Sequence, residues 1–379
     1  MYPDLSYFLN DFFNTPIDSW TSVFKTNGVF LAITFGVCSI MLKNEFKRRE
    51  TIGLIKYVNP SKSTQWAENI FLVTFSTITG YKMLFIALNL SSFKINARDM
   101  IISWEGNIYG GLFFMLCSIG TIYLNHIEAK TSKKENYLYQ LSTHLTVFII
   151  IIAMIFNKLF GMLEVDFGGK TFYQIFNNSG TNFLGGLFGG ILGGYIFCKL
   201  YKIPFHNLLD SIAPIMMLGY AIGRLGCHFP GDGCWGIDNA STKPNWFVLP
   251  DWLWSYNYPR NITNKGITMV DAAGAYNKIL EVPVFPTPLY EAIFGFIMFI
   301  ILWRIRKKVI KSYLLFTYFL LSIGIERFLI EFIRINNKYH FAGLHLSQAQ
   351  FISLFLILFS ITFLLCAKFK TYLSSTTPH

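Results

Sequence analysis

Long runs of apolar residues, separated by short polar segments, dominate the chain. A helix that crosses a membrane needs about 20 mostly apolar residues, within a working range of about 17–25. Runs that approach this length occur at residues 28–43, 69–92, 109–125, 143–163, 183–199, 208–223, 286–304, 312–332 and 349–367. The pattern predicts an all-α fold, a polytopic bundle of about nine transmembrane helices. The run at 208–223 is the weakest of these, because it is short and begins near Asp210.

The composition of the chain is also that of a membrane protein. Of its 379 residues, 53% are hydrophobic and only 14% are charged, and the mean hydropathy is +0.42. A water-soluble domain carries roughly 25% charged residues. The composition therefore counts against a soluble enzyme, a disordered chain and a secreted disulfide scaffold.

The net charge of +11 is explained by orientation in the membrane. If the N-terminus lies outside, 18 Lys and Arg residues fall in or beside the cytoplasmic segments and 11 in the outer ones. Short cytoplasmic loops normally carry such an excess. We predict an outer N-terminus, a cytoplasmic C-terminus and no nucleic-acid partner. The N-terminal region lacks a basic segment and carries Asp4, Asp11 and Asp18, so we expect an uncleaved first span rather than a signal peptide.

Residues 1–379 are predicted to form a single integral membrane domain whose sizeable extramembrane part is the loop at 224–285. In this loop Gly, Pro, Asn and aromatic residues replace the apolar runs. Trp and Tyr are enriched where a membrane meets water, so we expect the loop at headgroup level on the outer, periplasmic face. Cys227 and Cys234 share the loop, and a disulfide between them in an oxidising periplasm is an open alternative. Neither a Cys-x-x-Cys nor a His-x-x-x-His pair occurs, so we predict no metal and no cofactor.

A ladder of glycines runs through residues 185–194, beginning with Gly185 and Gly186. Glycines repeat every four residues, which removes the side chains from one helix face and lets another backbone or a lipid chain approach closely. Tight helix packing is the favoured interpretation. Contact with substrate lipid is the alternative.

The segment from Gly223 to Gly236 is more specific. Arg224 stands at the predicted outer end of a span, followed by three further glycines that are candidate ligand contacts, Gly226, Gly231 and Gly236. An arginine at the edge of the hydrocarbon is costly unless it is paired, and its guanidinium suits phosphate oxygens. The alternative is an arginine that extends its charged group to the interface.

A second charged cluster is predicted at the outer end of the eighth span. Arg327, Glu331 and Arg334 are four and three residues apart and share one face if the helix continues. Tyr290 and Glu291 enter the seventh span, and Glu291 is a plausible partner for one of the arginines. An ion-pair staple between helices is the alternative to a functional role. Together these segments predict a groove of lipid size with cations at phosphate depth.

At these residues the chain resembles the phosphatidylglycerol–prolipoprotein diacylglyceryl transferase family. The similarity is carried by five segments and covers residues 175–367 well: Asp210–Pro214, Gly223–Gly236, Pro286–Glu291, Arg327–Arg334 and Leu346–Gln350. The family has seven spans with the orientation predicted above, so we place two additional spans within about 69–142.

The resemblance implies a reaction. Such enzymes of the bacterial inner membrane move the diacylglyceryl group of phosphatidylglycerol to the lipobox cysteine thiol in the signal peptide of a preprolipoprotein. A thioether forms and glycerol 1-phosphate leaves. Arg224 and Arg327 match the family's essential arginines, Glu331 and Arg334 match supporting charged residues, and Asp232 stands near its acidic position. The site is expected to face the periplasm.

The chain departs from the family pattern at three positions. Leu184 replaces a histidine proposed to activate the thiol, Asn27 replaces a tyrosine, and Cys227 replaces an asparagine. His228 is a candidate substitute base, although a loop histidine is more often a solvated surface residue. The alternative hypothesis is an inactive lipid-binding or transport relative on the same scaffold.

Overall fold

The structure of the chain is a computed structural model. It describes residues 1–17, 19–55, 62–93, 100–101, 103–131, 138–163, 175, 183–270, 274–336, 338–341 and 344–376. Two predicted cytoplasmic loops therefore lie partly outside the described residues, at 56–61 and 132–137.

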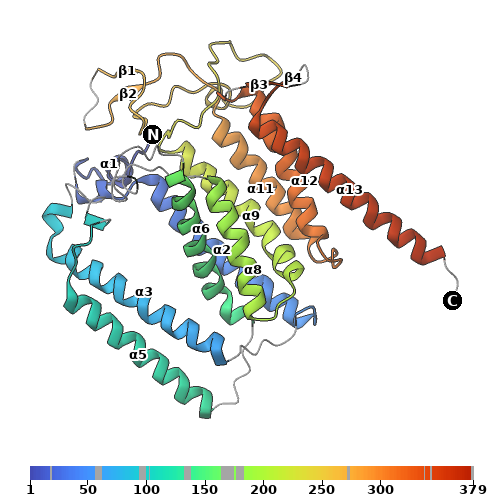
Figure 1. Cartoon of the computed structure of the whole chain (residues 1–379). Helices are drawn as coiled ribbons and strands as arrows, with labels where there is room; N and C mark the ends of the chain where they lie inside the picture. Colours follow the sequence, from blue (N-terminus) through green and yellow to red (C-terminus); the bar gives the residue numbers. More distant parts are fainter. Residues whose placement is uncertain are drawn as a thin grey trace. The chain divides into compact units, whose positions relative to one another are not determined.

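Helices dominate the described residues, which confirms the predicted all-α fold (Figure 1). The α-helices are α1 (Leu5–Phe13), α2 (Thr26–Thr51), α3 (Lys62–Leu88), α5 (Ile108–Thr131), α6 (Ser142–Leu163), α8 (Phe183–Leu200), α9 (Phe205–His228), α10 (Asp251–Trp254), α11 (Thr287–Ile305), α12 (Leu314–Ile330) and α13 (Gln348–Thr376). Short 3-10 helices lie at Trp20–Val23, Leu138–Leu141 and Glu331–Ile333. A described helix lies at each of the predicted spans.

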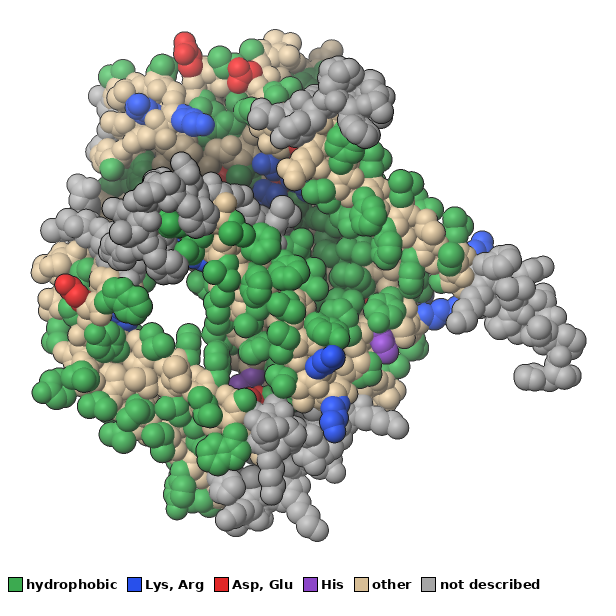
Figure 2. Space-filling view, viewed as in Figure 1, with side chains coloured by type: hydrophobic (Ala, Val, Ile, Leu, Met, Phe, Trp, Pro, Cys, Tyr) green, Lys and Arg blue, Asp and Glu red, His purple; other side chains and the backbone are tan. Residues whose placement is uncertain are grey.

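Six of these helices are long and apolar enough to cross a membrane, and α5 and α8 contain shorter apolar stretches. Large hydrophobic side chains are exposed along them, among them Ile297 on α11 and Phe355 and Leu358 on α13. Figure 2 shows hydrophobic side chains over much of the helical surface. Exposed apolar surface on this scale is what a lipid environment requires. The number of spans and their orientation stay predictions.

The described residues divide into two compact units. One comprises Met1–Leu42 and His206–His379, and the other comprises Lys43–Phe205. In the second unit α3 packs on α5 and α6 packs on α8. The α3–α5 pair lies where we placed the two additional spans.

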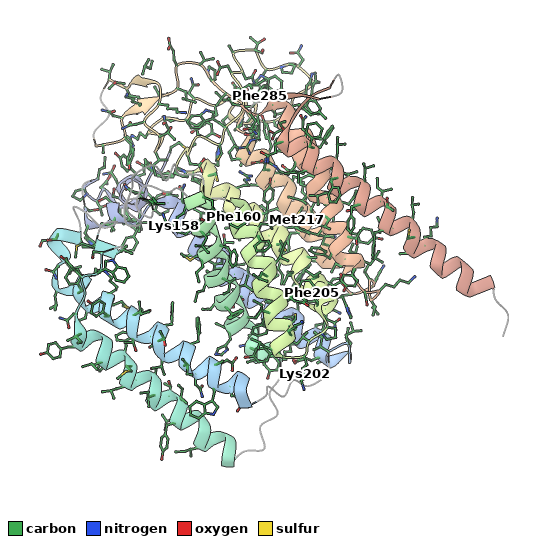
Figure 3. All side chains as sticks on the ribbon, in the orientation of Figure 1. Lys158, Phe160, Lys202, Phe205, Met217 and Phe285 are labelled. Atoms are coloured by element: carbon green, nitrogen blue, oxygen red, sulfur yellow. The ribbon has the colours of Figure 1, made fainter. Side chains whose placement is uncertain are left out.

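The core of the first unit is built from α9, α11 and α12. Ala213 and Met217 of α9 pack with Leu302 of α11 and with Leu315 and Phe319 of α12. Met217 is labelled midway along α9 in Figure 3. Complete burial of such side chains stabilises by about 1.5–3 kcal/mol each, so this cluster fixes the three helices to one another.

A buried carboxylate joins two helices of this unit. Asp210 lies in α9, yet its oxygens accept the backbone N–H groups of Tyr313 and Phe316 at 2.8 and 3.0 Å. The first N–H groups of a helix have no partner within it, and the helix dipole favours negative charge there. Asp210 therefore caps α12 from a neighbouring helix. The span predicted at 208–223, the weakest of the predicted spans, is the longer helix α9. Asp210, the polar residue that weakened this prediction, is paired with the start of α12.

The loop between α9 and α11 folds back on itself through two short antiparallel strands, β1 (Ile267–Thr268) and β2 (Lys278–Ile279). Trp235, Tyr258 and Val284 form its core. Asn261 is fully buried, and its amide nitrogen donates to the carbonyl groups of Tyr258 and Lys265. A second antiparallel pair, β3 (Lys338–Phe341) and β4 (Leu344–Ser347), connects α12 to α13.

Candidate active site

A fully buried carboxylate lies at the centre of the candidate site. Glu291, one turn into α11, has no exposed surface. Its Oε1 accepts hydrogen bonds from Arg327 at 2.8 Å and from Arg334 at 3.1 Å. Its Oε2 lies 3.0 Å from Nε of Arg224. Three arginines from separate segments therefore share one carboxylate, as the sequence predicted for at least one of them.

Glu331 is the second carboxylate of this cluster. Its Oε2 lies 3.5 Å from Nη2 of Arg327, and its Oε1 accepts a hydrogen bond from the side chain of Asn336. We call Arg224, Arg327, Arg334, Glu291 and Glu331 the arginine cluster. Its three guanidinium groups and two carboxylates leave one net positive charge.

The arginines of the cluster are not completely enclosed. Their side chains keep between 14% and 24% of their exposure, whereas both carboxylates have none. Each guanidinium carries five N–H donors, and the ion pairs occupy only some of them. Among the described residues no ion pair occupies the other donors, which can therefore face a ligand at the exposed edge of the cluster.

The predicted helical face at 327–334 is only partly correct. The α-helix ends at Ile330, a 3-10 turn follows, and Arg334 has an extended backbone with φ −93° and ψ 154°. The reason is competition for the backbone: the carbonyl of Ile333 accepts the N–H of Ile237 at 2.9 Å. Arg334 pairs in an isolated bridge with Gly236. The loop therefore places Arg334 on Glu291 without continuing the helix.

Tyr220 and Glu326 also lie beside the cluster, and the sequence pattern did not single them out. The hydroxyl of Tyr220 donates to Oε2 of Glu326 at 3.0 Å, and the guanidinium of Arg224 lies 5.2 Å from the centre of the Tyr220 ring. The available signal was spacing, because Tyr220 lies four residues before Arg224 and so on the same helical face.

His228 has a different environment from the one expected. It is the last residue of α9 and is 8% exposed, so the surface alternative is wrong. Its Nδ1 lies 3.1 Å from the hydroxyl of Tyr258. Burial raises the pKa of Tyr258, which keeps this hydroxyl protonated. The described contacts of His228 join it to the loop rather than to the arginine cluster, and its role as a base stays a prediction.

Asp232 lies in the turn that follows α9. Its Oδ1 accepts the backbone N–H of Cys234 at 3.0 Å. Cys227 and Cys234 are free thiols. The hydrogen bond with Cys227 holds the pKa of Cys234 below its ordinary value.

The candidate glycines of this unit are packed against protein. A Cβ on Gly226 would lie 2.8 Å from Cβ of Phe30, and one on Gly236 would lie 2.4 Å from the carbonyl oxygen of Ile333. Gly231 has a positive φ of 63°, which its turn requires. These glycines therefore shape the loop around the cluster, and their contact with substrate stays a prediction.

Gly185 and Gly186 lie in the other unit, on α8. A Cβ on Gly185 would lie 2.4 Å from the carbonyl oxygen of Phe156 and 2.7 Å from Cβ of Phe160, which is labelled in Figure 3. A Cβ on Gly186 would lie 3.3 Å from the side-chain nitrogen of Asn157. These contacts are the tight helix packing, here between α8 and α6, that we favoured as the interpretation of the glycine ladder.

Two side chains at the start of α11 hold the loop. The hydroxyl of Tyr290, a candidate for substrate binding, donates to the carbonyl of Leu253, so the contact described for it holds the loop. The Thr287 hydroxyl donates to the carbonyl of Cys234 at 2.9 Å. The backbone N–H of Gly236 donates to the carbonyl of Phe285 at 2.9 Å, and Phe285 is labelled in Figure 3 where the loop meets α11. The loop is thereby fixed one turn from Glu291.

Comparison with known proteins gives one consistent result. A sequence model described as prolipoprotein diacylglyceryl transferase matches residues 100–366, which include the whole arginine cluster. The chain is 26% identical over 328 residues to a phosphatidylglycerol–prolipoprotein diacylglyceryl transferase of Leptospira interrogans, covering 73% of this chain and 93% of that one. It is 30% identical to the enzyme of that name from Stenotrophomonas maltophilia, over 58% of this chain and 78% of that one.

Proposed function

Because the chain belongs to the prolipoprotein diacylglyceryl transferase family, we propose that it transfers the diacylglyceryl group of phosphatidylglycerol to a prolipoprotein cysteine. It is a transferase, and the proposed acceptor is the lipobox thiol. The rival hypothesis of an inactive lipid-binding or transport relative has no support in the comparisons. We place the protein in the bacterial inner membrane, with the reaction on the periplasmic side.

The arrangement of the arginine cluster is the observation that carries this proposal. Phosphatidylglycerol presents a phosphodiester with one negative charge, and the cluster offers it three partly exposed guanidinium groups. Guanidinium groups bind phosphate oxygens in a bidentate manner. The arginines are partly exposed and stand at one end of α9, α11 and α12, next to the loop. A lipid that lies with its chains along the helices would bring its phosphate to this depth.

The charge change in the reaction explains why fixed cations assist it. The sulfur of the acceptor cysteine attacks the glyceryl carbon next to the phosphate oxygen, and a carbon–sulfur bond forms as the carbon–oxygen bond breaks. The bonding electrons leave with the oxygen, so the phosphate gains negative charge as glycerol phosphate departs. Arg224 and Arg327 are held rigidly by Glu291 and need no reorganisation to stabilise this charge. A preorganised donor of this kind is worth about 3–4 kcal/mol in the transition state.

The nucleophile of this reaction belongs to the substrate. The enzyme therefore needs to position two substrates, stabilise the leaving group and keep water away from it. In our assignment Arg224 and Arg327 contact the phosphate, Glu291 positions both, and Glu331 and Arg334 complete the cluster. The loop after α9 would receive the acceptor peptide.

Substitution of Arg224 tests the proposal. We expect Arg224→Ala to lower kcat for transfer from labelled phosphatidylglycerol to a lipobox peptide by about 100–1,000-fold. Arg304→Ala is a matched control, because Arg304 is an exposed arginine near the other end of α11. Both variants should insert into the membrane to the same extent. Unchanged transfer by Arg224→Ala would contradict the assignment, and failure of the natural chain to restore lipoprotein maturation in a transferase-depleted bacterium would contradict the function.

A further inference from the structure

Three potential metal ligands converge beside the arginine cluster. The ligand atoms of Cys227, Asp232 and Cys234 all lie within 4.8 Å of one another, and the three residues are partly buried. Among the described residues, no other three His, Cys, Asp or Glu side chains are close enough together to hold a metal ion. Two sulfurs and one carboxylate oxygen form a donor set that suits Zn²⁺, which protein ligands hold at about 2.0–2.3 Å. Small side-chain movements would bring the three atoms to one ion.

The backbone gives this group a defined shape. Cys227 lies in the last turn of α9, and its carbonyl accepts the N–H of Asp232 at 3.2 Å. Gly231 and Gly233 have positive φ values of 63° and 93°, which turn the chain back toward the helix end. The carbonyl of Cys234 accepts the hydroxyl of Thr287 at 2.9 Å. The three ligands are therefore fixed to both α9 and α11 and do not depend on a free loop.

The group also lies next to the site that we propose for the phosphate. Arg224 is one helical turn before Cys227 on α9, so the two side chains leave the same face of the helix. The two carboxylates of the arginine cluster are already paired with guanidinium groups. The acceptor thiol must nevertheless lose its proton, since the thiolate is the nucleophile. Coordination to a metal ion deprotonates a thiol outright.

In contrast to the expectation from the spacing of cysteine and histidine along the chain, we propose that Cys227, Asp232 and Cys234 bind a Zn²⁺ ion, and that the acceptor cysteine binds the same ion as its fourth ligand. Three protein ligands with an open fourth position are typical of catalytic rather than structural zinc sites. This inference rests on the proposed function, because it assigns the activation of the acceptor thiol. The proton of the thiol passes to solvent on coordination. The thiolate sulfur then attacks the glyceryl carbon, and the electrons of the broken carbon–oxygen bond leave on the phosphate held by Arg224.

Cobalt substitution tests the binding site directly. The full chain is purified in detergent, reduced, stripped with a chelator and titrated with Co²⁺. We expect a single equivalent to bind with a thiolate-to-cobalt absorption band in the near ultraviolet, and Zn²⁺ to abolish the band. Cys227→Ser and Cys234→Ser should each weaken binding at least about 100-fold, since even supporting residues around a metal account for about 10–100-fold. Cys366→Ser is the control, because Cys366 is an exposed cysteine on α13.

Addition of acceptor peptide tests the role of the metal. A lipobox peptide with cysteine should raise the band by about half, as the thiolate ligands increase from two to three, and the same peptide with serine should not. Chelation should lower transfer at least about 100-fold, and Zn²⁺ should restore it. Absence of the band, its persistence in Cys227→Ser, no response to the cysteine peptide, or a Cys227–Cys234 disulfide in freshly isolated protein would overturn the proposal.

The two proposals fail in different ways. Full transfer by the chelated protein would overturn the metal site and leave the transferase function intact. A protein that shows the cobalt band and the peptide response, yet transfers nothing from phosphatidylglycerol when loaded with Zn²⁺, would keep the site and contradict the function.

Discussion

Glu291 is the residue whose removal should have the largest effect, because three arginines depend on its charge. Glu291→Gln preserves the shape of the side chain but removes the negative charge and one acceptor oxygen. The amide nitrogen that replaces this oxygen would be a donor facing a guanidinium donor. The cluster would then hold three cations and a single carboxylate in a buried setting.

The magnitude follows from the geometry. At an effective dielectric constant near 20, charges about 4 Å apart interact by about 4 kcal/mol, and Glu291 has three such partners. Part of this energy is recovered, because a buried carboxylate no longer has to be desolvated. Removing one partner of a buried ion pair typically costs about 3–5 kcal/mol. We expect Glu291→Gln to lose about this much stability and to have little transferase activity.

The measurement is a denaturant titration in detergent followed by circular dichroism, together with transfer to a lipobox peptide. Glu281→Gln is the control, because Glu281 is an exposed glutamate in the loop. Arg334→Gln in the Glu291→Gln background should relieve repulsion, so the double variant should be about 1–3 kcal/mol more stable than the sum of the single effects. Additive effects, or a Glu291→Gln variant as stable and active as Glu281→Gln, would refute the reasoning.

Three further predictions concern packing and capping. Gly236→Ala should destabilise the protein by about 1–3 kcal/mol and lower transfer, because its Cβ would lie 2.4 Å from a backbone oxygen. Gly223→Ala has open space around its Cβ and should be neutral or stabilising. Similar denaturation curves for the two variants would contradict this prediction. Asp210→Ala should cost about 2 kcal/mol in the same titration, because α12 loses its cap, and no loss would show that the cap is dispensable. Gly185→Ala should destabilise the chain while Gly120→Ala does not, and the opposite order would exclude the helix-packing role.

The helical fold could be predicted because lipid imposes a simple rule on sequence. Backbone polar groups in the hydrocarbon must find partners within the protein, and a helix provides them within its own segment, so a long apolar run locates a helix. The ends of the helices were less accessible. The apolar pattern begins α9 at residue 208, but the described helix begins at Phe205. Asp210, which made this span the weakest prediction, is paired with the start of α12, and hydropathy cannot show such a partner.

The charged residues of the candidate site could be predicted from the sequence better than their arrangement in space. Arginines and a glutamate near helix ends indicated an ion-paired cluster, since isolated charges are costly in a membrane. That one carboxylate serves all three arginines depends on the packing of α9, α11 and α12, which spacing along the chain does not determine. Asp232 likewise meets two cysteines only because two glycines turn the backbone.

The arginine cluster comes from separate stretches of the chain, around Arg224, Glu291 and Arg327–Arg334, and this has a consequence for biosynthesis. The ribosome delivers Arg224 before the glutamate that neutralises it, and Arg327 and Arg334 come later still. An early intermediate therefore enters the bilayer with an unbalanced cation and no assembled anion receptor. If the cluster is the phosphate site that we propose, phospholipid cleavage begins only after the segment with Arg327 and Arg334 has packed beside α9 and α11, and a partly synthesised chain would be inactive.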